Sequence, residues 1–264
     1  MLASPSSSAA PPVSPAVSPS LASRQEHGAA AAPLSSFYLG SERSALRALD
    51  ARDVSLAIWR RRLPPLVQGA VAGWAAQASP FEAALRVSDE DLAALQAPLA
   101  QVTDLDARSW LFEDVRSLVR ELAERAGVAS VKVSLGPVRT DQCRKFHVDH
   151  LRMRLVTTYA GPGTEWIANE HVERSVLAHP PSCPCDANQQ ILRAGGAVRH
   201  CEAGDVLLMK GARYGGAEQG AVHRSPPIEQ LAITRLVLIV SAEASAASQS
   251  AARTSRPGGR AARR

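Results

Sequence analysis

Residues 146–159 read FHVDHLRMRLVTTY, and this stretch decides the fold. Its apolar and β-branched residues favour a strand, in which side chains two positions apart point to the same face. His147 and Asp149 therefore share one face. Thr157 and Tyr159 lie further along that same face, which is the more apolar one, and we expect it to point inward.

The opposite face of this predicted strand is more polar and carries His150, Arg152 and Arg154. Successive side chains of a strand alternate between its faces, so His150 points away from His147 and Asp149. We therefore do not expect its ring to belong to the same site.

A carboxylate on an inward face needs a counter-charge or a metal ion, because burying it alone is costly. The segment His223-Arg224-Ser225-Pro226 supplies a second histidine from a distant strand. Two histidines and one carboxylate bind Fe(II) on one side and leave positions open for a co-substrate and oxygen. His147, Asp149 and His223 are therefore candidate metal ligands. The alternative is a structural, hydrogen-bonded pair of His147 and Asp149 that faces the core.

Arg235 is a lone cation inside the apolar run Ile233–Val240. A guanidinium in such a strand must meet an anion, and its planar fork suits a carboxylate. If Arg235 is structural, Asp205 or Glu165 is its expected partner. Arg224 either helps to anchor an anion or caps a turn.

The folded body divides into a helical first half and a strand-rich second half. Helices are predicted over Leu66–Gln77, Asp89–Leu99 and Asp106–Ala126, the last one ended by Gly127. The predicted later strands are Ser130–Leu135, Ala197–Cys201, Asp205–Met209 and Ile233–Val240, with a long insertion at Glu173–Gly196. Helices followed by short strands predict an α+β fold, with a helical layer packed on an antiparallel barrel.

The two ends of the chain differ from this body. Of the 264 residues 45% are hydrophobic, but residues 1–36 are mostly Ala, Ser and Pro, and residues 241–264 form a basic tail. Both ends are predicted to be disordered, which leaves residues 37–240 as one domain, mainly helical over 37–127 and a β-barrel over 128–240. The tail's five arginines and one glutamate supply +4 of the net charge of +5. The near-neutral body argues against a nucleic-acid-binding domain.

Several function classes are excluded by missing motifs. The sequence has no P-loop, no dinucleotide fingerprint and no nucleophile elbow. It has no apolar run long enough for a signal core or a membrane span, so we expect a cytoplasmic protein. A structural zinc site is a separate alternative, built on Cys183-Pro184-Cys185 together with Cys143, Cys201, His171, His179 and His200.

The order of these motifs resembles that of the Fe(II)/2-oxoglutarate oxygenases, most closely their prolyl-hydroxylase-like members. The resemblance is carried by His147-x-Asp149, Arg154, Tyr159, Gly163-Thr164, Gly204–Leu208, His223 and Arg235. It implies a double-stranded β-helix in which His147, Asp149 and His223 hold the catalytic iron. It also implies that Arg235 binds the far carboxylate of 2-oxoglutarate. We expect Thr157, Tyr159 and Arg224 to line the same cofactor pocket.

A second resemblance covers most of the body. The strings Cys143–His150, Arg154–Trp166, Leu208–Gly211 and His223–Pro226 are similar to a bacterial family known as domain of unknown function 1826. Members of that family often neighbour genes for zinc-homeostasis GTPases, which implies a link to such a GTPase and favours zinc as the metal. The leading hypothesis is an oxygenase-like enzyme acting on a small molecule or protein, and the alternative is a non-enzymatic zinc-binding protein.

Overall fold

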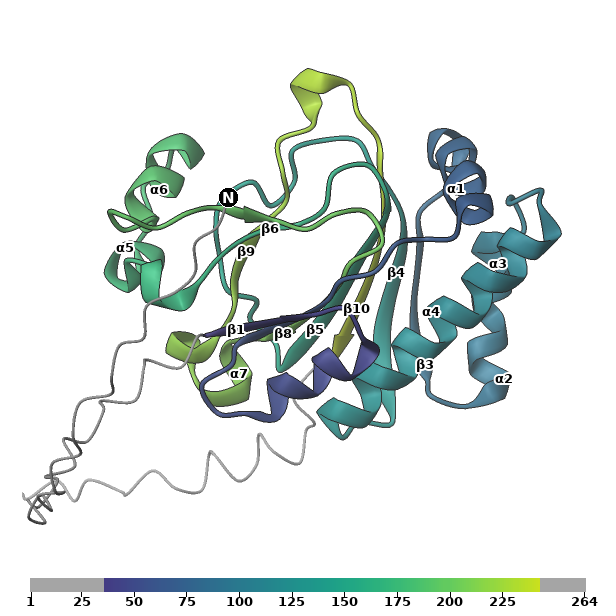
Figure 1. The fold of residues 1–264 in the computed structure, drawn as a ribbon, viewed down its shortest axis with the longest axis horizontal. Coiled ribbons are helices and arrows are strands. Elements are labelled where there is room, and N and C mark those ends of the chain that lie inside the picture. Colours follow the sequence, from purple (N-terminus) through teal and green to yellow (C-terminus); the bar gives the residue numbers. More distant parts are fainter. Residues whose placement is uncertain (1–35, 243–264) are drawn as a thin grey trace, which may run out of the picture. The chain divides into compact units, whose positions relative to one another are not determined.

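Two β-sheets form the centre of the computed structural model, which describes residues 36–242 (Figure 1). The major sheet contains, in spatial order, β1 (Phe37–Gly40), β2 (Leu56–Trp59), β8 (Val206–Lys210), β5 (Met153–Ala160), β10 (Arg235–Ala242), β4 (Ser130–Val138) and β3 (Phe81–Arg86). The minor sheet contains β7 (Arg199–His200), β6 (Glu165–Ile167) and β9 (Val222–Arg224). All neighbouring strands are antiparallel except β1 and β2, which are parallel.

The chain moves repeatedly between the two sheets. It leaves β4 of the major sheet, pairs His147 with β9 in the minor sheet, and returns to the major sheet in β5. It then passes through β6 and β7 in the minor sheet, β8 in the major, β9 in the minor and β10 in the major sheet. This alternation is a double-stranded β-helix, and it confirms the predicted α+β fold class.

A helical layer covers one face of the major sheet (Figure 1). It consists of η1 (Arg43–Asp50), α1 (Pro65–Gln77), α2 (Asp89–Leu92), η2 (Ala93–Leu95), α3 (Gln96–Leu99) and α4 (Leu105–Ala126). Leu111, Val115 and Leu118 lie on the buried stripe of α4, as the helical spacing predicts. The Asp104 carboxylate caps the start of α4, and Gly127 ends it with a φ of 64°, a left-handed conformation that favours glycine.

The insertion between β6 and β7 folds into two short helices, α5 (Arg174–Ala178) and α6 (Pro184–Ile191). They lie beside the minor sheet and close a small apolar cluster with Phe146 and Val222 (Figure 1). Four further one-turn helices occupy loops: η3 (Asn169–His171), α7 (Ala212–Gly215), η4 (Ala217–Gln219) and η5 (Glu229–Leu231).

Three strands in the first half are missing from the sequence prediction. β1 and β2 extend one edge of the major sheet, and β3 forms its other edge. The predicted terminal segments, 1–36 and 241–264, lie outside the described residues except for Ser36, Ser241 and Ala242. The last two continue β10 beyond the predicted end of the body. No helix within residues 36–242 is long and apolar enough to cross a membrane.

Candidate metal centre

The three predicted metal ligands lie together at the end of the minor sheet. His147 and His223 form an antiparallel bridge in which each backbone amide donates to the other's carbonyl at 3.1 Å. Their rings stand 4.6 Å apart between centroids. One ligand atom from each of His147, Asp149 and His223 can be chosen so that all three lie within 4.8 Å of one another. This spacing is suitable for three ligands around a single ion.

Backbone carbonyls orient both imidazole rings. The Nδ1 of His147 lies 2.9 Å from the carbonyl of Lys145, and the Nδ1 of His223 lies 3.2 Å from that of Ala221. A carbonyl can only accept, so in each neutral ring Nδ1 carries the proton and Nε2 keeps its lone pair. Both Nε2 atoms face Asp149, and a ring fixed in this way is the arrangement that metal-binding histidines require.

The two carboxylate oxygens of Asp149 have different surroundings. Oδ1 accepts a hydrogen bond from Nη1 of Arg154 at 2.5 Å. Oδ2 is buried, has no hydrogen-bond partner, and lies 3.5 Å from Nε2 of His223. A buried carboxylate oxygen without a partner is costly, and a cation held between Oδ2 and the two rings would remove that cost. The residues present therefore fit a metal ion.

Asp149 and His223 are both held in the protonation state that binds a metal, a deprotonated carboxylate and a neutral imidazole. Burial raises the pKa of Asp149, but the neighbouring side chains of His147, His223 and Arg154 outweigh it, so the pKa is lowered overall. Burial lowers the pKa of His223 to about 4, so this ring is neutral at pH 7. For His147, burial lowers the pKa, but the nearby Asp149 carboxylate and the hydrogen bond to the Lys145 carbonyl outweigh it, so the pKa is raised overall. Binding a metal through His147 therefore competes with its protonation.

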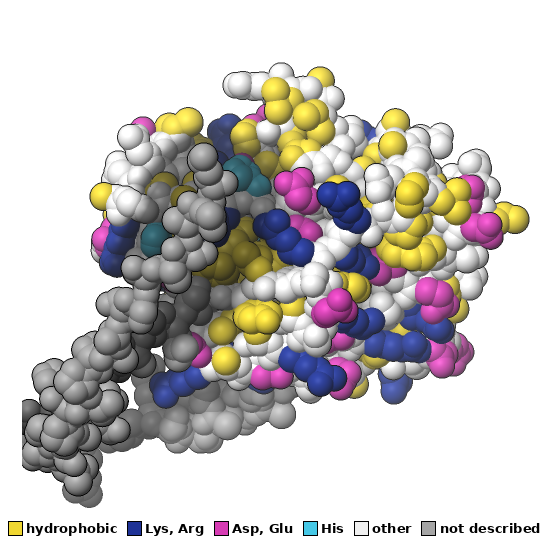
Figure 2. Space-filling view, viewed as in Figure 1, with side chains coloured by type: hydrophobic (Ala, Val, Ile, Leu, Met, Phe, Trp, Pro, Cys, Tyr) yellow, Lys and Arg dark blue, Asp and Glu magenta, His cyan; other side chains and the backbone are white. Residues whose placement is uncertain are grey.

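A cavity of about 100 Å³ adjoins the triad. Arg235, the predicted anion-binding residue, is part of its lining. The lining combines His147 and His223 with apolar side chains of β4, β5 and β10, namely Val138, Val156, Val237 and Ile239. In Figure 2 the molecule is hollowed between the lobe that carries α5 and α6 and the body, with Lys and Arg side chains at the edge of the hollow.

Arg235 is buried without an acidic partner in the part of the chain that the structure describes. It donates to the carbonyl of Pro162 at 2.7 Å and to the hydroxyls of Ser225 and Thr158 at 3.2 Å each. These bonds use three of its five N–H groups. Burial lowers its pKa to about 10, partly offset by the charge of Glu165, so the guanidinium stays charged at pH 7.

The expected carboxylate partners of Arg235 are engaged elsewhere. Asp205 accepts from the backbone amides of Arg61 and Glu202, and Glu165 pairs with Arg224. The cavity therefore has a positive charge available for an anion.

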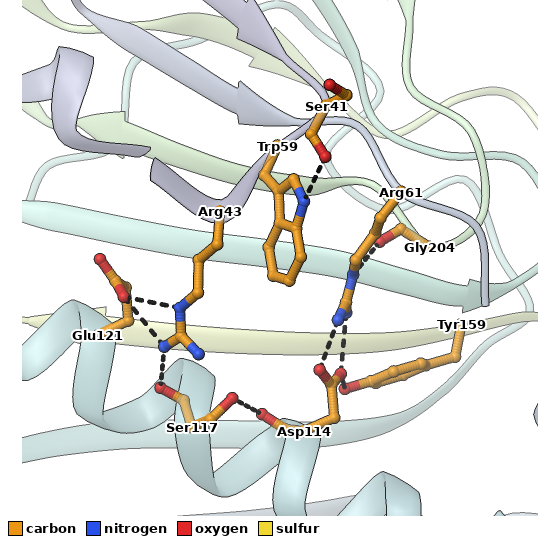
Figure 3. A network of polar contacts seen from close by, with 9 residues as sticks. All are labelled: Ser41, Arg43, Trp59, Arg61, Asp114, Ser117, Glu121, Tyr159 and Gly204. Carbon is orange, nitrogen blue, oxygen red and sulfur yellow. Dashed lines mark hydrogen bonds and ion pairs between the residues drawn. The ribbon is translucent and has the colours of Figure 1, made fainter. Parts of the chain in front are cut away.

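Two of the predicted pocket residues point the other way. The strand does not run through 146–159, because residues 150–152 form a bend and β5 begins at Met153. The alternation restarts after the bend, so Thr157 and Tyr159 face the helical layer instead of the cavity. Thr157 is fully buried, and the hydroxyl of Tyr159 donates to Asp114 of α4 at 2.8 Å (Figure 3). Arg154, predicted to face outward, lines the cavity instead.

Arg224 lines the cavity, as predicted, and its guanidinium is paired with an acid. Its Nε donates to Glu165 at 2.6 Å, and its guanidinium lies 4.5 Å from the ring centre of Phe146. The side chain is thus held in an ion pair at the wall of the cavity.

The alternative zinc ligands do not converge. Among the described residues, the triad is the one group of three or more His, Cys, Asp or Glu side chains close enough for a metal ion. Cys143, Cys183 and Cys185 are exposed and Cys201 is buried, all as free thiols. His150 is exposed, as predicted, and does not join the triad.

Gly211 packs directly against the bend that follows Asp149. A Cβ at this position would lie 2.1 Å from the carbonyl oxygen of Leu151 and 2.9 Å from that of Asp149. We expect Gly211→Ala to lower the free energy of unfolding by about 1–3 kcal/mol and to weaken metal binding, because the bend must move. Urea denaturation and a metal titration measure both effects. The control is Gly69→Ala on α1, where a Cβ meets nothing within 4 Å and the helix should gain stability. A stable Gly211→Ala variant with unchanged affinity would show that this contact is dispensable.

Comparisons with known proteins give one family match and several remote structural similarities. No curated protein matches the sequence significantly. A rice dioxygenase for auxin oxidation aligns at 11% identity and a TM-score of 0.43, over 77% of this chain and 78% of that one. A Pseudomonas putida prolyl-4-hydroxylase aligns at 11% identity and a TM-score of 0.38, over 76% and 97% of the two chains. A putative oxygenase from Shewanella oneidensis aligns at 11% and 0.40, over 82% and 97%.

Similarities this remote say nothing about what the chain binds. The family match is more informative, because the profile described as "Protein of unknown function (DUF1826)" matches residues 40–240, which include both sheets and the whole triad. The chain belongs to the DUF1826 family.

Proposed function

We propose that this protein is a mononuclear, non-haem Fe(II)/2-oxoglutarate-dependent oxygenase. The observation that carries the proposal is the meeting of two features around one cavity. The triad His147, Asp149 and His223 presents a buried oxygen without a partner, and Arg235 presents a buried positive charge without an acid. A metal ion and a carboxylate-bearing co-substrate would complement the two features.

The chain's own residues have distinct roles in this proposal. His147 and His223 would bind the metal through Nε2, and Asp149 through Oδ2. Iron held by such a set leaves positions open where the co-substrate and oxygen bind. Arg235, held by Pro162 and two hydroxyls, would bind the far carboxylate of 2-oxoglutarate with its remaining N–H groups. The valines around it would keep water away and strengthen that ion pair.

An anaerobic Fe(II) titration in the presence of 2-oxoglutarate tests the proposal. The expected result is a visible charge-transfer band that requires both components. Arg235→Met should raise the 2-oxoglutarate concentration needed for the band by about 100-fold, since it removes two charge-assisted hydrogen bonds. The control is Arg174→Met, because Arg174 is also partly buried on backbone carbonyls, those of Ala217 and Gly220, but does not line the cavity.

Other outcomes would contradict the proposal in different ways. A band that forms equally well with Arg235→Met would remove Arg235 from the co-substrate site. Tight zinc binding through the triad with no 2-oxoglutarate-dependent band would contradict the oxygenase proposal and support the alternative, a non-enzymatic zinc-binding protein.

A further inference from the structure

Arg154 connects the major sheet to Asp149, the one predicted metal ligand that lies outside regular secondary structure. Asp149 lies in the segment between the His147 bridge and the start of β5, outside any strand. Arg154 lies on β5, and its Nη1 reaches back to Oδ1 of Asp149 at 2.5 Å. Oδ2 receives no hydrogen bond and lies 3.5 Å from Nε2 of His223, while Nε2 of His147 lies 3.7 Å from Oδ1.

The guanidinium is itself held in place. Its Nε donates to the hydroxyl of Ser241 at 3.3 Å, and Ser241 is the residue opposite Arg154 in the pairing of β5 with β10. Arg154 is thus fixed across two adjacent strands of the major sheet while it holds the carboxylate. The side chain is about one quarter exposed, where it lines the cavity.

We propose that Arg154 is a positioning residue of the metal centre, which holds Oδ1 so that Asp149 binds the metal through Oδ2 alone. Carboxylates bind metal ions through one oxygen or through both. With Oδ1 held, the protein supplies three ligand atoms and no fourth, so the side of the ion toward the cavity stays open. The inference rests on the proposed function in one respect, namely that the triad binds a metal.

Charge and geometry predict opposite effects for the loss of Arg154. A positive guanidinium close to a divalent cation repels it, so a purely electrostatic role predicts tighter binding when Arg154 is removed. A positioning role predicts weaker binding, because the partners that orient a metal ligand typically contribute about 10–100-fold in affinity. The sign of the change therefore separates the two roles.

Co(II) is the probe for the test, because its visible absorption reports coordination number as well as binding. Arg154→Met should weaken Co(II) binding by about 10–100-fold and change the absorption spectrum, as Oδ1 becomes free to coordinate. Arg154→Lys keeps a charged donor for Oδ1 and should keep the parental spectrum with a smaller loss of affinity. The control is Arg116→Met, since Arg116 has similar exposure and is ion-paired to Glu113 and Asp89 on the helical side.

The outcomes separate this inference from the proposed function. If Arg154→Met binds Co(II) as tightly as the parent, or more tightly, the positioning role is wrong. Equal losses in Arg154→Met and Arg154→Lys with unchanged spectra would show a merely structural role and also overturn it. If the unmodified protein binds no Co(II), the metal centre itself is refuted, and this inference with it.

Discussion

His223→Ala should abolish tight metal binding and leave the fold in place. His223 supplies the ligand that lies farthest along the chain from the other two, and its neutral ring is directed at Oδ2 of Asp149. Loss of an outer partner of a metal ligand already costs about 10–100-fold in affinity, so loss of the ligand itself should cost more than about 100-fold. Competition of Zn(II) or Fe(II) with a coloured chelator measures this change directly.

The matched control for His223→Ala is His150→Ala. His150 is next to Asp149 in the sequence, but its side chain is exposed and outside the triad. The affinity of this variant should equal that of the parent. Retention of metal affinity by His223→Ala, or an equal loss in both variants, would show that the metal is bound elsewhere or that the triad is only a hydrogen-bonded cluster.

The second large effect concerns stability. Asp114 of α4 accepts two hydrogen bonds from Arg61, at 2.5 and 2.8 Å, and one from the hydroxyl of Tyr159 (Figure 3). The Arg61 and Asp114 side chains are 9% and 7% exposed. Asp114→Ala leaves a buried guanidinium without its counter-charge, so it should lower the free energy of unfolding by about 3–5 kcal/mol. The same network connects the helical layer to β5 and to the carbonyl of Gly204.

Urea denaturation of the metal-free protein measures this effect, since bound metal would add its own stabilisation. The control is Asp89→Ala, which removes exposed ion pairs to Arg116 and Arg120 and should cost less than about 1 kcal/mol. If both variants lose a similarly small part of the free energy of unfolding, the Arg61–Asp114 pair contributes little to stability.

Residue types and their order were enough to predict the triad. His147 and Asp149 are two residues apart in an apolar segment. His223 and Arg235 follow on later strands, in the order on which the resemblance to the Fe(II)/2-oxoglutarate oxygenases rests. The structure places His147, His223 and Arg235 around one cavity, with Asp149 beside the two histidines. The end of α4 could also be predicted, because Gly127 is a clear stop signal, and the helix starts one residue before the predicted Asp106.

Alternation alone could not predict which side chains of β5 point toward the cavity. The bend at residues 150–152 shifts the pattern by one position, and such a shift moves every following side chain to the other face. Thr157 and Tyr159 were therefore assigned to the cavity in place of Arg154 and Val156. The bend depends on distant contacts, since the carbonyls of Asp149 and Leu151 accept from Ala212 and Arg213.

The short edge strands and the buried ion pair were missed for a related reason. β1 and β2 have four residues each, too few for a clear period, and β2 joins the sheet through the distant strand β8. Arg61, Asp114 and Tyr159 are separated by 53 and 45 residues, and no local spacing connects them. Only the packing of α4 on the major sheet brings them together.

Anomalous diffraction from crystals grown with Zn(II) tests the metal centre most directly, because thiolates and imidazoles compete for this ion. We expect one strong peak at about 2.0–2.2 Å from Nε2 of His147, Oδ2 of Asp149 and Nε2 of His223. A peak at Cys183 and Cys185 with none at the triad would contradict the central claim.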